Sequence, residues 1–348
     1  MEGTTGGGVR VVSRRMIWPE FTSFLNGELS PERETVHLTP WDLRLLTVEN
    51  IQKGVLLPNP PTGGERLVEH LASSFACALG RFYPFAGRLA VAGVDDGASP
   101  PRSISVSLCC NNKGAEFVHA AAPDVAIADI VASLYIRRVV WSFFPLNGVA
   151  AAHAATESLP VLAAQVTELC DGVFIAMSIN HVVGDGTNFW EFMNTWSEIS
   201  RSGSGKLDVS PSPSPSSSSP PPVVKRWFLD TCTVPIPLPF AKLEHIIPRC
   251  EHLPPVQECF FPLSAESIRK LKAKANDEVG GAVAISSLQA FVALVWRSVS
   301  RARGLAPCQE TAYVLVVGCR GRVGGISAGY MGNAVVPGAV RLTAGEIL

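Results

Sequence analysis

The sequence lacks the charge imbalance and the long apolar runs that mark nucleic-acid-binding and membrane-spanning proteins. Its 29 Lys and Arg residues balance 30 Asp and Glu residues, for a formal net charge of -1, and they form no basic block. Because phosphate backbones are held by clustered positive charge, we expect no nucleic-acid partner. No apolar run reaches the roughly 18 residues that a spanning helix needs, and the opening residues lack the apolar core of a signal sequence. We therefore expect a soluble chain without membrane attachment or export.

The cysteines form no recognisable disulfide or metal-binding pattern. The chain has nine of them, an odd number, with no Cys-x-x-Cys pair. The adjacent Cys109 and Cys110 are poor partners for each other. No Asn-x-Ser/Thr glycosylation site is present either, so a reducing, cytoplasmic location is expected. With 348 residues, 47% hydrophobic and 17% charged, the chain can bury sizeable cores and has room for two domains.

A Ser/Pro-rich segment divides the sequence. Residues 202–222 contain alternating Ser and Pro, then runs of each, and such a composition cannot build a core. We interpret it as a flexible crossover between a domain at residues 1–201 and a second domain at residues 223–348. A long surface loop inside one domain is the alternative, although unstructured loops of this length are uncommon in compact units.

Helical and strand patterns occur on both sides of this segment. Before it, apolar residues recur every fourth position, and the turn-like residues 83–89 end that helix and start a strand. After it, an apolar stripe predicts a helix that begins at an N-cap, Ser286 or Ser287. Residues 312–317 then predict a buried strand. The mixture indicates an α/β or α+β architecture. The helical positions are Leu67, Leu71, Phe75 and Leu79 in the first helix and Leu288, Phe291, Val292, Val295, Trp296 and Val299 in the second.

The segment from His181 to Gly186 carries the clearest chemistry. It follows an apolar run at residues 173–179 and precedes a helical stripe of Phe189, Met193, Trp196 and Ile199, which we interpret as core packing. The glycines at its end suit a tight turn, so His181 is expected at a strand end and Asp185 near a helix N-terminus, where negative charge is favoured. Imidazole, with an ordinary pKa of about 6.5, can take up and return protons near neutrality.

Three other interpretations compete for these residues. His181 could be a structural histidine that is hydrogen bonded within its turn. Gly325 to Gly329 fits the Gly-x-Ser-x-Gly pattern of serine hydrolases, with Ser327 as nucleophile, but its flanks do not resemble a strand and a helix, and no histidine follows it. A metal site at His181 and Asp185 lacks a third ligand at useful spacing.

Taken with several other segments, this turn makes the chain resemble the plant BAHD acyltransferases, which are coenzyme A dependent enzymes marked by His-x-x-x-Asp-Gly. Further family-like segments appear in the family's order through nearly the whole chain. They are Leu38 to Leu43, Phe82 to Leu89, Ile285 to Ala290 with Trp296 and Arg297, Arg320 to Arg322, and Tyr330 to Ala334.

The resemblance implies an α/β fold of two domains like chloramphenicol acetyltransferase, each a mixed sheet flanked by helices, with His181 in a channel between them. The implied activity moves an acyl group from a coenzyme A thioester to a hydroxyl or amine of a small plant specialised metabolite. His181 would be the general base and Asp185 would shape the turn by pairing with an arginine, for which Arg320 is the candidate. Ser286 and Ser287 match a segment near the coenzyme A channel. Acyl-CoA would be a co-substrate, no cofactor would be bound permanently, and the protein would be a monomer.

Two departures from the family pattern bear on these expectations. The family's Asp-Phe-Gly-Trp-Gly segment is missing, so we expect a truncated chain whose second domain is incomplete and exposes strand edges and apolar surface. Gly318 stands where the family often has Asp or Asn. A catalytically inactive homologue with a binding role is therefore the alternative function.

Overall fold

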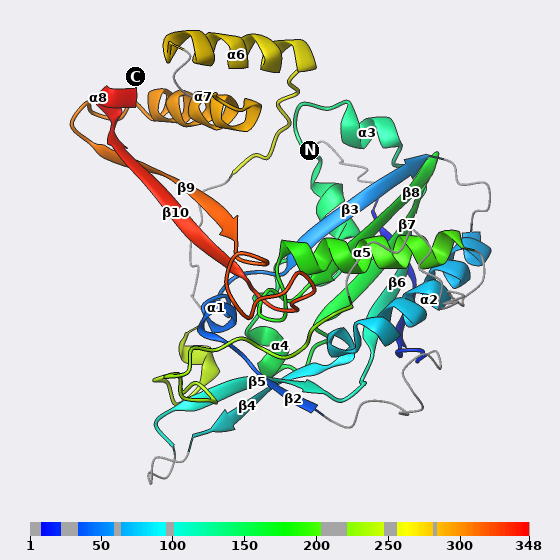
Figure 1. Ribbon diagram of the computed structural model, residues 1–348. Helices are drawn as coiled ribbons and strands as arrows, with labels where there is room; N and C mark the ends of the chain where they lie inside the picture. The colour runs from blue at the N-terminus through cyan, green and yellow to red at the C-terminus, as the bar shows by residue number, and fades with distance from the viewer. Residues whose placement is uncertain are drawn as a thin grey trace, which may run out of the picture. The chain divides into compact units, whose positions relative to one another are not determined.

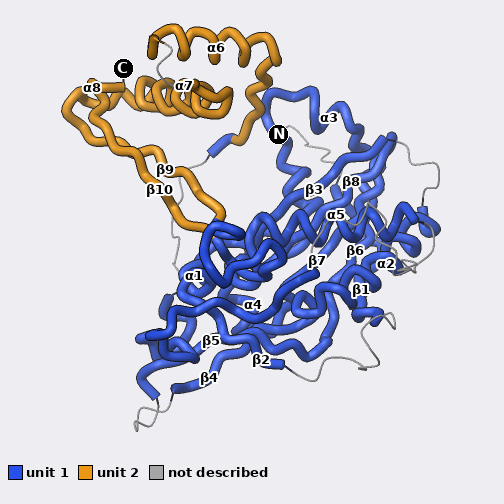
Figure 2. Tube along the Cα trace, in the orientation of Figure 1, with its two compact units in different colours: residues 1–257, 319–334 blue, residues 258–318, 335–348 orange. Residues whose placement is uncertain are grey.

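The computed structural model describes residues 8–21, 34–58, 64–94, 101–202, 221–246, 256–280 and 284–347. The chain forms two compact units, coloured separately in Figure 2: residues 1–257 with 319–334 make unit 1, and residues 258–318 with 335–348 make unit 2. Each unit is therefore built from more than one stretch of sequence. Residues 203–220 of the predicted crossover lie outside the described residues, and the predicted division there stays a prediction.

Unit 1 contains two sheets, with helices between and around their strands (Figure 1). Its strands are β1 (Arg10–Ile17), β2 (Glu34–His37), β3 (Ile51–Pro58), β4 (Arg88–Gly93), β5 (Ile104–Cys110), β6 (Ala115–Ala122), β7 (Leu162–Leu169) and β8 (Gly172–Ile179). Its helices are α1 (Pro40–Leu43), α2 (Gly64–Arg81), α3 (Ile127–Val131), α4 (His153–Thr156) and α5 (Gly186–Arg201), with short 3-10 turns η1 (Tyr83–Ala86), η2 (Arg138–Phe143) and η3 (Leu243–His245).

The larger sheet has the order β1-β6-β7-β8-β3 and is mixed, as predicted. β6 and β7 run parallel, and the other neighbours run antiparallel. All eight residues of β8 are buried, because its alternating side chains enter two different cores. Val173 and Ile175 pack into a large cluster that includes residues of α2 and α5, while Phe174 and Ala176 join a smaller cluster with residues of α3 and η2.

The two long helices of unit 1 confirm the predicted stripes. Phe75 of α2 and Trp196 of α5 are buried, and their ring centroids lie 5.0 Å apart. The indole N–H of Trp196 also donates to the carbonyl of Leu71, at 3.0 Å. Leu67 is only partly buried, at the edge of the same core. α5 is thereby fixed on the sheet, and its N-terminus lies directly after the His181 turn.

The smaller sheet of unit 1 has the order β2-β5-β4, and its strand β4 begins in the predicted turn at residues 83–89. η1 lies within that turn, and β4 begins at Arg88. Gly87 is required between them, because a Cβ atom there would lie 2.5 Å from the carbonyl oxygen of Cys109 on β5. This connection takes the chain from α2 into the second sheet.

Unit 2 consists of α6 (Ala265–Glu278), α7 (Ser287–Ala302), β9 (Glu310–Gly318), β10 (Val335–Thr343) and α8 (Ala344–Ile347). β9 and β10 form an antiparallel pair, and the indole N–H of Trp296 on α7 donates to the hydroxyl of Thr311 on β9, at 3.1 Å. The predicted helix at α7 is confirmed. β9 confirms the predicted strand at residues 312–317, but its predicted burial was wrong: Val314 and Val316 are more than half exposed, because within unit 2 too little packs against this two-stranded ribbon.

Candidate active site

The His181 turn begins where β8 ends, as predicted, and Asn180 shapes it. The side-chain oxygen of Asn180 accepts from the amide of Val182, at 3.1 Å, and its side-chain N–H donates to the carbonyl of Ala151, at 2.9 Å. Val182 and Val183 are buried and anchor the turn in the core of unit 1. β8 ends at Ile179 and α5 starts at Gly186, so residues 180–185 form a short, well-fixed link between strand and helix.

Asp185 is the N-cap of α5. Its carboxylate accepts from the amides of Thr187 and Asn188, and so satisfies donors that a helix N-terminus leaves without partners. The other carboxylate oxygen accepts from Arg320 Nη1 at 2.7 Å and from the amide of Ala334 at 3.0 Å. Side chains in this ion pair are 3% exposed for Asp185 and 10% exposed for Arg320. The predicted pairing of Asp185 with Arg320 is thus confirmed, and this carboxylate holds the turn together.

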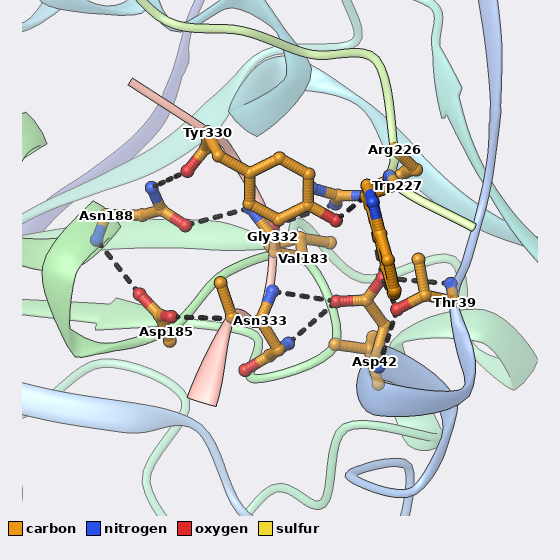
Figure 3. Close-up of polar contacts among 12 residues, drawn as sticks. Thr39, Asp42, Val183, Asp185, Asn188, Arg226, Trp227, Tyr330, Gly332 and Asn333 are labelled. Atoms are coloured by element: carbon orange, nitrogen blue, oxygen red, sulfur yellow. Dashed lines mark hydrogen bonds and ion pairs between the residues drawn. The ribbon is translucent and has the colours of Figure 1, made fainter. Parts of the chain in front are cut away.

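Asn188 and Arg320 attach residues 330–332 to the start of α5. Arg320 Nη2 donates to the carbonyl of Gly332 at 2.9 Å, and its Nε donates to that of Tyr330 at 3.1 Å. The side chain of Asn188 also donates to the Tyr330 carbonyl and accepts from the amide of Gly332, as Figure 3 shows. The backbone of this segment is therefore held on both its carbonyl and its amide side.

Residues 226, 227 and 330–332 pack tightly against one another. A Cβ atom on Gly332, whose φ of +131° is rare for L side chains, would lie 2.1 Å from Arg226 Nη1, so a larger residue there would displace the Arg226 side chain. Burial, and next the charge of Asp42, raise the pKa of Tyr330 above its usual value. Its phenol oxygen accepts from the amide of Trp227 at 3.3 Å. This neutral, buried ring forms one side of the cluster.

Burial also raises the pKa of Glu191, one turn into α5, and a hydrogen bond from Asn188 opposes that rise. The same Asn188 side chain contacts residues 330–332. Glu191 therefore belongs to the polar cluster at the start of the helix, although no sequence motif marks it.

His181 itself is half-buried, and its two polar parts have different surroundings. The main-chain carbonyl accepts from Nδ2 of Asn333 at 2.7 Å. The ring atom Nδ1 is buried and has no hydrogen-bond partner among the described residues. The turn is therefore anchored through its backbone, while within the described part of the chain no hydrogen bond restrains the imidazole.

Asp42, Arg226 and Asn333 also escaped the sequence analysis. Asp42 and Asn333 lie in segments that resemble the BAHD family, but nothing in the sequence said that the two would meet. In the structure Asp42 Oδ1 accepts from both the amide and the side-chain nitrogen of Asn333, each at 2.9 Å. Arg226 had no motif to mark it, and its Nη2 donates to the carbonyl of Val183 at 3.0 Å.

Ser286 and Ser287 lie at the start of α7 in unit 2. The hydroxyl of Ser286 accepts from the amide of Gln289 at 3.2 Å, and the Gln289 side chain accepts in return from the amide of Ser286, which is a capping box. Ser287 is the first residue of the helix and is exposed. A contact of either serine with coenzyme A stays a prediction.

The structure also bears on the serine-hydrolase and metal-site interpretations and on membrane spanning. Ser327 lies between Cys319 and Ala334, where the backbone forms turns and bends; neither a strand before it nor a helix after it provides a hydrolase elbow. Within the described ranges, no three His, Cys, Asp or Glu side chains gather as a metal site would require. No helix in the described part of the chain has the length and apolar character needed to cross a bilayer.

Comparisons with known proteins place these features in a family. The model of the Transferase family matches residues 11–348. An uncharacterized acetyltransferase of Arabidopsis thaliana is 34% identical over 90% of this chain and 68% of its own length. Shikimate O-hydroxycinnamoyltransferase of Nicotiana tabacum is 28% identical, over 92% of this chain and 70% of the relative.

A solved structure supports the fold. TRI101 of F. sporotrichioides, in complex with coenzyme A and T-2, aligns with a TM-score of 0.59 at 16% identity, over 90% of this chain and 70% of that one. At this level of identity the likeness concerns the fold alone. The mixed sheet and its flanking helices therefore have a counterpart among known structures.

Proposed function

This chain belongs to the Transferase family, that of the acyl-CoA-dependent BAHD acyltransferases, and we propose that it transfers an acyl group from a coenzyme A thioester to a small molecule. The acceptor is a hydroxyl or an amine, and His181 is the general base. The observation that carries the assignment is the His181 turn: its backbone is anchored by Asp185, Asn333 and Arg226, while the imidazole keeps free of hydrogen bonds within the described residues.

The burial of Nδ1 gives the two ring nitrogens different roles. Because Nδ1 is enclosed, Nε2 is the nitrogen that meets the acceptor. A neutral imidazole carries its proton on one nitrogen and accepts on the other, so the proton resides on Nδ1 before the reaction. The acceptor hydroxyl or amine then donates its hydrogen bond to Nε2.

In the reaction, Nε2 removes the proton of the acceptor as the oxygen or nitrogen attacks the thioester carbonyl carbon. The tetrahedral intermediate expels the thiolate of coenzyme A, and the imidazolium returns the proton to that sulfur. One C–S bond breaks, one C–O or C–N bond forms, and no acyl-enzyme is required. General base catalysis of this kind contributes roughly 10² to 10⁴-fold. Asp185 takes no proton in this scheme; its ion pair with Arg320 and its cap of α5 keep the turn in shape.

The proposal is tested by measuring thiol release with acetyl-CoA or p-coumaroyl-CoA as donor and shikimate or a panel of phenolic alcohols and amines as acceptors. Release should require both substrates. His181→Ala should lower kcat by about 10² to 10⁴-fold. A variant that keeps most of the activity would show that His181 is not the base.

A thermal melt with free coenzyme A separates transfer from binding alone. A ligand at 100 times its Kd stabilises the native state by about 2.7 kcal/mol, which raises the melting midpoint. A chain that melts cooperatively, is stabilised by coenzyme A and releases thiol should be a transferase. Stabilisation by coenzyme A without thiol release from any substrate pair would contradict transfer and favour a binding protein.

A further inference from the structure

We propose that Asp42 and Asn333 are positioning residues for His181, acting on its main chain from two segments remote in sequence. This inference rests on the proposed function, because it assigns the two residues to the same imidazole. It adds a second anchor to the turn: Asp185 and Arg320 hold the end of the turn, whereas Asp42 and Asn333 hold its beginning.

The side chain of Asn333 connects the carboxylate of Asp42 to the main-chain carbonyl of His181. It is completely buried, and its Nδ2 donates to Asp42 Oδ1 at 2.9 Å and to the carbonyl of His181 at 2.7 Å. A carboxylate and a carbonyl both only accept, so the amide nitrogen must face them and the orientation of the amide is determined. The amide therefore cannot flip without losing both hydrogen bonds.

Asp42 fixes Asn333 because it is itself held in place. The carboxylate is completely buried, and its Oδ2 accepts from both the amide and the hydroxyl of Thr39, at 3.0 and 2.8 Å. Oδ1 accepts from the amide and the side chain of Asn333. Figure 3 shows the carboxylate of Asp42 between these two residues, which come from opposite ends of the sequence.

The carboxylate of Asp42 also acts on the His181 turn through Arg226. Arg226 Nε lies 3.6 Å from Asp42 Oδ2, and the two side chains are almost fully buried, so the guanidinium compensates the charge of Asp42. Arg226 Nη2 donates to the carbonyl of Val183. One buried ion pair thus holds the carbonyl of His181 through Asn333 and the carbonyl of Val183 through Arg226.

This arrangement should matter for rate more than for substrate affinity. A carbonyl fixed at residue 181 fixes the peptide plane and hence the direction in which the side chain leaves the backbone. A displacement of a reacting group by about 1 Å can cost roughly 10²-fold in rate. Neither Asp42 nor Asn333 needs to touch a substrate for this effect.

The test compares Asn333→Ala and Asp42→Asn with a matched control, Gln165→Ala. Gln165 is also a buried amide that donates to a main-chain carbonyl, that of Ser142 at 2.9 Å, but it lies in the middle of β7. Asn333→Ala and Asp42→Asn should each lower kcat by about 10 to 100-fold with little change in KM for either substrate. Gln165→Ala should lower the melting midpoint by a similar amount and leave kcat within about threefold.

Two readouts distinguish positioning from simple loss of folded protein. An unfolded fraction, measured at each pH and divided out, accounts for a loss of folded protein, whereas a displaced imidazole changes the shape of the corrected pH-rate profile. The double variant Asp42→Asn with Asn333→Ala should be no worse than the poorer single variant, because the two residues act as one unit. Effects that multiply, or a profile that is only scaled down, would overturn the proposal.

A third readout needs no substrate. The ring signals of His181 in a two-dimensional ¹H–¹³C spectrum can be assigned by their absence from His181→Ala. They should shift in Asn333→Ala and stay in place in Gln165→Ala. If Asp42→Asn does not fold, Thr39→Val is the milder variant, since it removes the 2.8 Å hydrogen bond to Oδ2 and keeps the volume. Unshifted ring signals in Asn333→Ala and Thr39→Val would overturn the proposal.

These results can be told apart from failure of the proposed function. Activity that survives His181→Ala would refute the assignment of His181 as general base. The positioning role would then be judged by the ring signals of His181 alone. Activity that is lost in His181→Ala but intact in Asn333→Ala and Asp42→Asn would refute only the positioning role.

Discussion

The ion pair of Asp185 and Arg320 has almost no contact with water, so each charge depends on the other. Removing one partner of a buried pair leaves an uncompensated charge, which costs about 3–5 kcal/mol. We expect Arg320→Gln to lower the free energy of unfolding by this amount, measured by urea denaturation followed by tryptophan fluorescence. Arg320→Lys keeps the charge but loses the planar guanidinium, and should fall between the wild type and Arg320→Gln.

The matched control for this prediction is Arg137→Gln. Arg137 pairs with Asp129 at 3.0 Å, but both side chains are more than 40% exposed. Such a surface pair contributes about 0–1 kcal/mol. If Arg320→Gln destabilised the protein no more than Arg137→Gln does, the buried pair would not be what holds the turn.

The sequence identified only part of this site, for a reason of distance along the chain. His181 and Asp185 are close in sequence, so their spacing and the following helix sufficed to predict a turn and an N-cap. The pairing of Asp185 with Arg320 came from the family resemblance alone. Asp42 and Asn333 are 291 residues apart, and no local pattern reports a contact of that separation. Arg226 follows a Ser/Pro-rich segment and belongs to no motif.

Among the secondary-structure elements, α7 allows a direct comparison of helix capping and coenzyme A binding, because the two serines at its start have different roles. Ser286 is the N-cap, and replacing such a cap with Ala costs about 1 kcal/mol. Ser287 lies inside the helix and is exposed, so Ser287→Ala should change stability by no more than about 0.5 kcal/mol. Thermal melts of the two variants without ligand measure this difference.

The same two variants separate capping from coenzyme A binding. If Ser287 contacts the donor, Ser287→Ala should reduce the upward shift of the midpoint that coenzyme A causes, without lowering the midpoint of the free protein. Equal shifts in the wild type and both variants would mean that neither serine binds the donor.

Periodicity predicted α2, α5 and α7, but it missed α6, which has no buried apolar stripe, and it predicted the burial of strands less well. α2, α5 and α7 were indicated by apolar residues at helical spacing, which depends only on the local sequence. An apolar run such as residues 312–317 does predict a strand, and β9 confirms it. Whether that strand is buried depends on what packs against it, and this is a property of the whole molecule. β8, an equally apolar run, is buried on both faces because two helical layers supply partners.

At the scale of the whole molecule, unit 2 carries an unusual amount of exposed apolar surface. Val314, Leu315 and Val316 of β9 and Val340 of β10 are each 47–63% exposed. Contiguous apolar surface and strand edges favour association. The family resemblance implies a monomer, but this exposed surface leads us to expect self-association with rising concentration, which Val316→Lys should weaken. Sedimentation velocity over a range of concentrations measures it.

The control is Val48→Lys, at an exposed valine of unit 1 that is 40% exposed. Scattered apolar residues of this kind are ordinary on protein surfaces, so this change should leave association unaltered. Equal effects of the two substitutions would indicate a general influence of charge, and would contradict a role for the β9 surface.

The discontinuous path of unit 1 has a consequence for how the protein is made. The chain completes α5, passes through β9 and only then supplies residues 319–334, which return to the His181 turn. During synthesis, Arg320, the ion-pair partner of Asp185, is made 135 residues after it. Asn333, which hydrogen bonds to Asp42, is made 291 residues after that residue. Until Arg320 is made, the carboxylate of Asp185 has to stay hydrated, since burying it unpaired would be costly, whereas Arg226 can compensate the charge of Asp42 earlier. Closure of the turn should accordingly be among the last events of folding, with the sheet of unit 1 assembled first and the imidazole set in place at the end.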